Sequence, residues 1–331
     1  MAEATIRDVA RRADVSVATV SRSLNGLGNV SEKTRARIVQ AVKDLGYVPH
    51  AGARSLSLSR SNAVGVVLPD LHGEFFSELV RGMDLEASRR DYLLLLSNLH
   101  GGSARASEAL RTMRGRVDGL VVMAPHLGEG ELAAALPAGI PAVLVNPRAP
   151  VDGFATLRLD NAAGARAVAE HLIGLGCRRI VHIRGPAENI DAQERAEAFR
   201  EAVATAGAAL MLVDGDFSEG SGEAAISQLI ASGATFDAIF AANDNMAIGA
   251  LQALGRAGLR VPDEVAVAGF DDIPLARHVR LTTVRVRIAE LGERALARLL
   301  DILKGADDAV DELHRPELVV RATTFSEARA T

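Results

Sequence analysis

A closely spaced set of helix signals in the first fifty residues constrains the fold more than any other feature of this chain. Thr5 and Asp8 have the spacing of a capping box, in which the hydroxyl accepts from a free backbone N–H and the carboxylate reaches back. Asp14 stands where this first helix must end, because Asp tolerates the left-handed backbone of a turn. Between these signals the apolar residues recur at helical spacing, at Ile6, Val9, Ala10 and Ala13.

Two further helices follow. Ser16 suits the N-cap of the second, on which Val20 and Leu24 are one turn apart and face inward. The third begins at Ser31 and ends at Gly46, a residue that suits a helix C-cap. Its inward side is formed by Ile38, Ala41, Val42 and Leu45.

Any one of these segments alone is typical of an ordinary capped amphipathic helix, whereas the ordered set favours a helix-turn-helix whose second helix enters a DNA major groove. On the outward side of that helix, Arg22 can bind guanine through two hydrogen bonds, and Val17 and Ala18 can contact thymine methyl groups. Contacts to phosphates, which position the protein without reading sequence, are expected from Ser16, Thr19, Ser21, Asn25, Ser31 and Thr34.

A linker rich in small residues follows, from position 49 to 61. It can form a weak hinge helix, Ala53 and Arg54 included, that lies in a minor groove and inserts Leu56 between base steps. Gly52 lowers the stability of this helix by about 1 kcal/mol relative to alanine, so we expect the helix to be stable only when DNA is bound. The alternative is a flexible tether, which the neighbouring helix-turn-helix makes less favourable.

In this combination the motifs resemble those of the lactose-repressor (LacI/GalR) family of bacterial transcription factors, and the resemblance extends along nearly the whole chain. The motifs are Thr5-Ile6-x-Asp8-Val9-Ala10, Val15-Ser16-x-x-Thr19-Val20-Ser21-Arg22, Val30-Ser31-x-x-Thr34-Arg35, Leu45-Gly46-Tyr47-x-Pro49 and Ala53-Arg54-Ser55-Leu56. The resemblance implies a repressor whose operator affinity is changed by a small molecule, and a homodimer. Tetrameric members add a leucine heptad after the last strand, which the few residues after Phe325 are too short to form, so a dimer is expected.

The charge balance agrees with a basic DNA-binding domain joined to an acidic domain of a different kind. Residues 1 to 60 contain ten Lys and Arg against five Asp and Glu, so the overall charge of −5 leaves −10 on the remaining residues. Cys177 is the only cysteine, which excludes an internal disulfide and a cysteine zinc site, and we expect no metal and no cofactor. The longest apolar run, Tyr92 to Leu96, is too short to span a bilayer, and no signal peptide is recognisable, so a cytoplasmic protein is expected.

Beyond the linker, short apolar runs alternate with helical patterns, which indicates parallel sheets in α/β layers. The expected strands are 63–69, 92–98, 119–123, 142–146, 156–160, 179–184, 210–214, 238–242 and 265–269. These strands are too many for one compact sheet, so we expect two similar lobes. The resemblance implies a periplasmic-binding-protein type I architecture in which the chain crosses between lobes and residues 291–304 return to the first. The expected domains are 1–48, the hinge 49–61, and 62–331, with lobe 1 as 62–160 plus 291–317 and lobe 2 as 161–290 plus 318–331.

Polar and aromatic residues stand just beyond several expected strands, where ligands bind in sheets of this kind. Aromatic faces together with Asp, Asn and Arg groups suit a polyhydroxylated ring, so a sugar or sugar derivative is the leading effector, with nucleobases and small acids as alternatives. The predicted effector-binding residues are Asp70, Phe75, Phe76, Asn146, Asp160, Arg195, Phe217, Asn243 and Asp271. Each strand-end Asp can instead be a helix cap, and Phe75 or Phe76 can instead be core.

The resemblance implies ligand contacts at Arg195 in Arg-x-x-x-Phe, Asn243 in Ala-Asn-Asp and Asp271 in Gly-Phe-Asp-Asp, and ring stacking at Phe217. Val286 stands where many sugar-responsive members carry Gln. Two other functions remain open at this point. An enzyme would use Asp271 with Asp272, or Asp160 with another group, as acid and base, and a corepressor-dependent regulator would bind a nucleobase or other metabolite. A pure solute-binding protein would lack the N-terminal DNA-binding domain.

Overall fold

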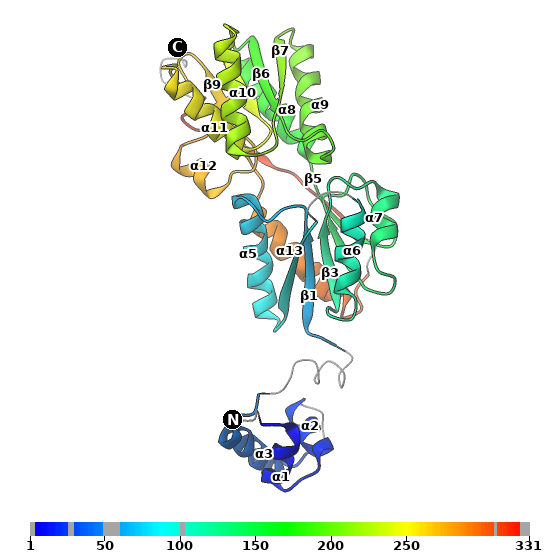
Figure 1. Ribbon diagram of the computed structural model, residues 1–331. Helices are drawn as coiled ribbons and strands as arrows, with labels where there is room; N and C mark the ends of the chain where they lie inside the picture. The colour runs from blue at the N-terminus through cyan, green and yellow to red at the C-terminus, as the bar shows by residue number, and fades with distance from the viewer. Residues whose placement is uncertain (1–3, 26–29, 49–59, 100–102, 308–309, 325–331) are drawn as a thin grey trace. The chain divides into compact units, whose positions relative to one another are not determined.

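The computed structural model describes residues 4–25, 30–48, 60–99, 103–307 and 310–324, and the chain forms two compact units. One unit contains residues 1–63 with 116–118, and the other contains the remainder. The predicted hinge residues Ala53 and Arg54 and the predicted wedge Leu56 lie outside the described residues. Both units are drawn in Figure 1.

The N-terminal unit contains the expected helices α1 (Ile6–Ala13), α2 (Val17–Leu24) and α3 (Glu32–Leu45). Their facing sides enclose a small core to which Leu24, Val42 and Leu45 add at its edge. Tyr47, just past α3, joins this core and was not anticipated. The buried core residues are Val9, Ala10, Ala13, Val20, Ile38, Ala41 and Tyr47.

The predicted helix ends are confirmed at the level of single atoms. Asp8 Oδ2 accepts from the Thr5 N–H at 3.0 Å and from the Thr5 hydroxyl at 2.6 Å. The Ser16 hydroxyl oxygen accepts from the Thr19 N–H at 3.1 Å, as expected of an N-cap. Asp14 and Gly46 end α1 and α3 with φ of 51° and 59°, in the left-handed region. Residues at the helix termini therefore determine where these helices begin and end, through side-chain hydrogen bonds at the N-caps and left-handed backbone at the C-caps.

The larger unit contains the two expected parallel sheets, which confirms the α/β architecture. The first sheet has the order β11-β5-β4-β3-β1-β2 and the second the order β7-β6-β8-β9. The first comprises β1 (Ala63–Leu68), β2 (Leu93–Asn98), β3 (Gly119–Met123), β4 (Ala142–Val145), β5 (Ala155–Leu159) and β11 (Asp311–His314). The second comprises β6 (Arg179–Arg184), β7 (Ala209–Asp214), β8 (Ala238–Ala241) and β9 (Ala266–Ala268). We call each sheet with its helices a lobe.

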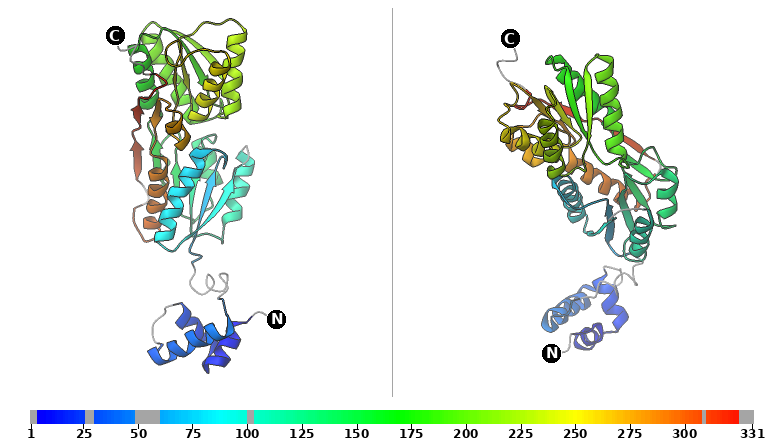
Figure 2. Two further views of the ribbon diagram at one scale, coloured as in Figure 1. Left: turned by 90° about the vertical axis from the view of Figure 1, so that its left-hand side faces the viewer. Right: turned by 45° about the horizontal axis from the view of Figure 1, so that its top comes forward.

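Helices cover both faces of each sheet, as Figures 1 and 2 show. In the first lobe, α5 (Glu74–Arg89) and α13 (Ile288–Ile302) pack on one face, and α6 (Ser103–Met113) and α7 (Glu129–Ala135) on the other. In the second lobe, α8 (Asn161–Gly174) pairs with α9 (Ile190–Thr205), and α10 (Glu219–Ala231) pairs with α11 (Asp244–Arg256). A short helix, α12 (Pro274–His278), follows β9.

Glycines set the closest helix contacts in both lobes. A Cβ at Gly82 of α5 would stand 1.9 Å from the Ala289 carbonyl oxygen at the start of α13. A Cβ at Gly249 of α11 would likewise stand 1.9 Å from the Glu219 carbonyl oxygen of α10. Only a residue without a side chain lets the two backbones approach this closely.

Three strands were not anticipated from the sequence. The strands β10 (Thr283–Arg285) and β12 (Glu317–Val319) pair antiparallel in a small sheet of their own, and β11 extends the first sheet beside β5. All three are short, and β11 and β12 are polar, so neither length nor periodicity marked them. The chain passes between the lobes at β5 to α8, at β10 to α13 and at β11 to β12. None of the helices among the described residues has the length and apolar character that a membrane crossing requires.

Candidate functional site

The outward side of α2 presents the three residues predicted to read base edges. Val17, Ala18 and Arg22 are all exposed, whereas Val20 on the other side is fully buried. Four of the hydroxyls predicted to contact phosphates lie at the starts of α2 and α3. The hydroxyl oxygens of Ser16 and Thr19 are 2.8 Å apart, and those of Ser31 and Thr34 are 2.9 Å apart. The remaining two predicted phosphate contacts, Ser21 and Asn25, are half-buried on α2 and at its C-cap, with the Asn25 amide donating to the Ser21 hydroxyl at 3.4 Å.

The larger unit holds a cavity of about 440 Å³ whose lining comes from both lobes. Seven of the nine predicted effector residues line it, and they follow strands that lie far apart in the sequence. These are Asp70, Phe75, Phe76, Arg195, Phe217, Asn243 and Asp271. The rest of the lining is Pro69, His72, Gly73, Met123, Pro125, Pro186, Asn189, Asp191, Asp216, Ser218 and Asn245.

On the first-lobe side, the cavity is bordered by the turn after β1 and the start of α5. Phe75 and Phe76 meet edge to face, with ring centroids 5.3 Å apart. Both rings are half-buried, which leaves apolar surface available at the cavity. Asp70 holds the turn, because its Oδ1 accepts from the backbone N–H of Leu71 at 2.7 Å and of His72 at 3.1 Å.

On the second-lobe side, Arg195 is the central group. Its Nη1 donates to the carbonyl oxygen of Ala242 at 2.6 Å and to Asp271 Oδ1 at 3.4 Å. The guanidinium lies over the ring of the buried Phe270, with 3.7 Å from its carbon to the ring centroid. Because a planar guanidinium has five donors in a fixed fork, this anchoring fixes its plane beside the cavity.

Two buried carboxylates share this one guanidinium. Burial raises the pKa of Asp271 to about 7, an effect that Arg195 opposes and Asp191 reinforces. Burial also raises the pKa of Asp191, which Arg195 and the amides of Asn161 and Asn146 lower. Near pH 7 the Asp271 carboxyl can therefore donate as well as accept a hydrogen bond.

Phe217 and Asn243 form a further edge of the cavity. The Asn243 side chain caps α11 by accepting from the Met246 N–H at 3.0 Å, and its amide donates to the Phe217 carbonyl oxygen at 3.0 Å. Phe217 has a φ of 71°, and its ring lies against Gly185, where a Cβ would come within 2.5 Å of the ring. Gly185 thus leaves the space that the ring occupies.

The lobes touch directly beside the cavity. The Ile190 N–H at the start of α9 donates to the Pro125 carbonyl oxygen after β3, at 3.0 Å. The Leu275 N–H in α12 donates to Glu74 Oε2 in α5 at 2.8 Å. Arg148 Nη2 also donates to Gln193 Oε1 at 2.8 Å.

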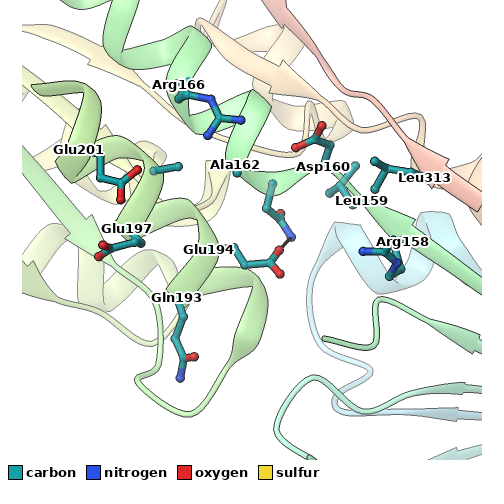
Figure 3. A pocket seen from close by; sticks show the side chains of 12 residues that line it. Arg158, Leu159, Asp160, Ala162, Arg166, Gln193, Glu194, Glu197, Glu201 and Leu313 are labelled. Atoms are coloured by element: carbon teal, nitrogen blue, oxygen red, sulfur yellow. Dashed lines mark hydrogen bonds between the residues drawn. The ribbon is translucent and has the colours of Figure 1, made fainter. Parts of the chain in front are cut away.

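Two of the predicted effector residues do not line the cavity, which corrects the expectation for them. Asp160 is the N-cap of α8, where its Oδ1 accepts from the Ala163 N–H at 2.9 Å. Asn146 is buried, and its Oδ1 accepts from the Leu159 N–H at 3.1 Å. Both side chains are used to hold their own strand ends, so local backbone groups compete for them. Asp160 borders a second cavity instead, of about 460 Å³, which Figure 3 shows between α8 and α9 with Glu194, Glu197 and Arg166.

Two residues at the site were missed from the sequence. Asp191 precedes Arg195 by four positions on one helix, a spacing that places both side chains on the same face and could have pointed to it. Asn161 follows the predicted Asp160 directly, and only its contacts in the fold distinguish it. Among the residues that the structure describes, no group of three or more His, Cys, Asp or Glu side chains is arranged to hold a metal ion.

Comparison with known proteins decides the family. The family model of bacterial regulatory proteins of the lacI family matches residues 5–50, and that of the periplasmic binding protein-like domain matches residues 169–324. The ribose operon repressor of Escherichia coli K12 is 39% identical over 306 residues, which are 90% of this chain and 92% of the relative. The chain belongs to the LacI family.

Other relatives of this LacI-family chain agree. The ribose operon repressor of Halalkalibacterium halodurans is 36% identical over 324 residues, 97% of each chain. The crystal structure of the lac repressor dimer bound to operator and the anti-inducer ONPF has a TM-score of 0.90, is 28% identical, and covers 98% of this chain and 100% of that one. As a member of this family, the chain is a DNA-binding transcriptional regulator with a helix-turn-helix domain and a periplasmic-binding-protein-like domain.

Proposed function

We propose that this chain is a cytoplasmic repressor that binds a palindromic operator as a homodimer and releases it when an uncharged sugar occupies the 440 Å³ cavity between the lobes. The observation that carries the proposal is the chemistry of that cavity, in which aromatic rings, an anchored guanidinium and buried carboxylates face one space. The relatives that repress ribose operons support a sugar as the effector class.

The charge of the lining favours a neutral polyol. Asp70, Asp191, Asp216 and Asp271 line the cavity against one arginine, Arg195. A phosphate or carboxylate would meet these acidic groups, whereas hydroxyls can satisfy both them and the guanidinium when water is displaced. The rings of Phe75, Phe76 and Phe217 offer apolar contact to a sugar's C–H faces. Val286, where Gln is common in sugar-responsive relatives, does not line this cavity.

At the DNA, one recognition helix reads only a few base pairs, so useful affinity requires two copies on a palindrome. Arg22 is expected to bind guanine through two hydrogen bonds. Arg22→Ala should weaken binding to the cognate site by about 1–3 kcal/mol and relax the preference at one position of each half-site. A selection of binding sites from random DNA measures this, and unchanged sequence selectivity would refute the assignment. Ser21→Ala, a phosphate contact, should weaken all sites alike.

The dimer is expected to use the exposed edge of the first sheet. The edge strand β2 carries Leu93, 69% exposed, together with exposed Leu95 and Leu96, and Leu85 of α5 is exposed as well. Such a group of exposed leucines is typical of an interface. Leu93→Glu with Leu96→Glu should yield a monomer in light scattering at micromolar concentration. Leu212→Glu on the edge strand β7 of the other sheet is the matched control and should leave the dimer intact.

Ligand and DNA are coupled only if the ligand prefers one arrangement of the lobes, since equal affinity for two arrangements shifts neither. The hinge helix with Leu56 is the proposed link, folded in the minor groove when the operator is bound and melted on release. Arg195→Ala and Asp271→Ala should bind operator normally and ignore the effector. Leu56→Ala should lose operator affinity while still binding effector.

The deciding experiment is a gel shift on the operator with D-ribose, D-galactose, hypoxanthine and guanine, combined with thermal unfolding in the same compounds. We expect a monosaccharide to raise the unfolding temperature and release the DNA. Tighter operator binding with a purine would instead identify a corepressor-dependent regulator. Loss of DNA binding by folded Arg195→Ala without any ligand would also contradict induction.

An acid and base pair for catalysis receives little support. Asp272, the proposed partner of Asp271, does not line the cavity. Its carboxylate instead accepts from Arg285 at 2.7 Å and from Arg321 at 2.5 Å. Turnover of the sugar that binds, followed by chromatography of the mixture, tests this alternative.

A further inference from the structure

Asn161 occupies the first position of α8 and contacts three charged side chains of α9 at once. Its Oδ1 accepts from Arg195 Nε at 2.8 Å. Its Nδ2 donates to Asp191 Oδ1 at 2.8 Å and to Glu194 Oε2 at 3.0 Å. The side chain is 1% exposed, so these bonds form where water cannot replace them.

Only an amide fits these three partners together. The guanidinium requires an acceptor, and the two carboxylates require donors, which a single amide offers on its two ends. A carboxylate at this position would face Asp191 and Glu194 with like charge, and an apolar side chain would remove the acceptor of Arg195 Nε and one donor from each carboxylate. The partners stand at positions 191, 194 and 195, one face of α9, so a single residue can reach them all.

Asn161 does not line the cavity, whereas Arg195 and Asp191 do. Its effect on a bound molecule must therefore pass through these two side chains. Glu194 borders the second cavity, where Figure 3 shows it on α9 facing α8, and burial raises its pKa. The amide thus joins the guanidinium and a carboxylate at the first cavity to a carboxylate at the second.

We propose that Asn161 is a positioning residue for effector binding, which holds the Arg195 guanidinium and the Asp191 carboxylate at the separation that a polyhydroxylated ligand bridges. The Phe270 ring below and the Ala242 carbonyl oxygen beside the guanidinium limit its plane, and Asn161 fixes its remaining rotation by binding Nε. This inference rests on the proposed sugar-responsive function, but part of its test requires no ligand.

The ligand-free test follows the Arg195 Nε–H in the whole protein labelled with ¹⁵N-arginine. The signal is assigned by its absence in Arg195→Lys, and its hydrogen exchange is measured. Asn161→Leu, similar in size but without polar atoms, should speed exchange of this proton at least tenfold or remove its signal. Asn161→Asp keeps an acceptor for Nε, so the signal should persist. Asp160→Ala removes the neighbouring cap of α8 and is the matched control, expected to leave the signal unchanged.

The ligand test is calorimetric titration with D-ribose. Asn161→Leu should weaken the affinity at least tenfold, Asn161→Asp should weaken it less, and Asp160→Ala should stay within twofold of the parent. An unchanged Arg195 signal together with an affinity within twofold in Asn161→Leu would overturn the proposal. If circular dichroism finds Asn161→Leu unfolded, Asn161→Asp decides: a persistent signal with weakened binding supports the proposal, and unchanged binding overturns it. If the parent binds none of the sugars, the effector assignment fails while the exchange experiment still decides the role of Asn161.

Discussion

The helical N-terminal domain and the two-lobed domain are built from different kinds of information. In the helical domain the helix termini are fixed by contacts between residues a few positions apart, such as Ser16 with Thr19, and the cluster of buried core residues has seven members. In the two-lobed domain the decisive contacts join distant segments, and Arg195 and Asp271 are 76 positions apart. The contrast teaches that local signals suffice to define a recognition helix, whereas a binding cavity depends on the order of strands in the sheets.

The first test of this contrast places one substitution in each core. Ile38 and Ile183 are both fully buried, and Ile→Ala costs about 2–5 kcal/mol at such sites. Because small domains are marginally stable, Ile38→Ala should unfold the helical domain and abolish operator binding at 25 °C. Ile183→Ala should leave the larger domain folded with a lowered unfolding temperature. Calorimetry with operator binding measures both.

The exposed neighbour Val39 provides the control for this test. Val39→Ala should change stability by less than about 0.5 kcal/mol, since it is a surface substitution. If Ile38→Ala bound operator as the parent does, the small core would not limit the helical domain, and the contrast between the two regions would fail.

A second test uses pH, to which titrating groups in the two regions respond in opposite directions. The folded pKa of Asp271 is raised to about 7, above its unfolded value, so its stabilisation is fully present below about pH 4 and is lost as pH rises to about 7. At about 1.4 kcal/mol per pH unit, this amounts to a few kcal/mol. Asp271→Asn should remove that part of the slope in urea unfolding between pH 4 and 7, and parallel curves for parent and variant would contradict the burial argument.

In the helical domain the sign is reversed. The Thr5 hydroxyl, as a hydrogen-bond donor, lowers the pKa of Asp8, and Gln40 lowers the pKa of Asp44. Stability from these groups is present above their ordinary pKa and is lost as pH falls through the folded pKa. Asp8→Asn should therefore lower the stability of the helical domain at neutral pH and flatten the acid side of its stability curve, so that parent and variant converge as pH falls.

The smallest expected change in stability comes from replacing a glycine with left-handed backbone. We expect this change to be equal in the two regions, because the backbone strain involves only the turn itself. Gly46 and Gly207 have φ of 59° and 69° with open space around them. Replacing either by alanine should cost about 1 kcal/mol through left-handed backbone strain alone. Gly255, inside α11 with open space, is the control, since Gly255→Ala should stabilise by about 0.5–1 kcal/mol. Thermal unfolding measures all three, and a much larger loss at Gly207 would mean that this turn is not local.

The sequence alone was sufficient for the elements with strong local patterns. All three N-terminal helices have the predicted caps, and the nine expected strands are present within a residue or two of their predicted ends. Apolar runs such as β1 and β3 are buried along their whole length, as strands of a parallel sheet must be. Seven of the nine predicted effector residues line one cavity, because the carboxyl ends of parallel strands meet at one edge of each sheet.

Tertiary structure alone decided which strand-end polar groups face that cavity and which serve the backbone. Asp160 and Asp271 both follow strands, yet Asp160 is used by the N–H of Ala163 while Asp271 meets Arg195. Buried backbone N–H groups must be satisfied, and Asp160 lies where the Ala163 N–H at the start of α8 needs an acceptor, whereas the position of Asp271 beside Arg195 depends on a residue 76 positions away. The short strands β10 and β12 and the role of Asn161 likewise depend on partners thirty or more positions away, which no local periodicity can report.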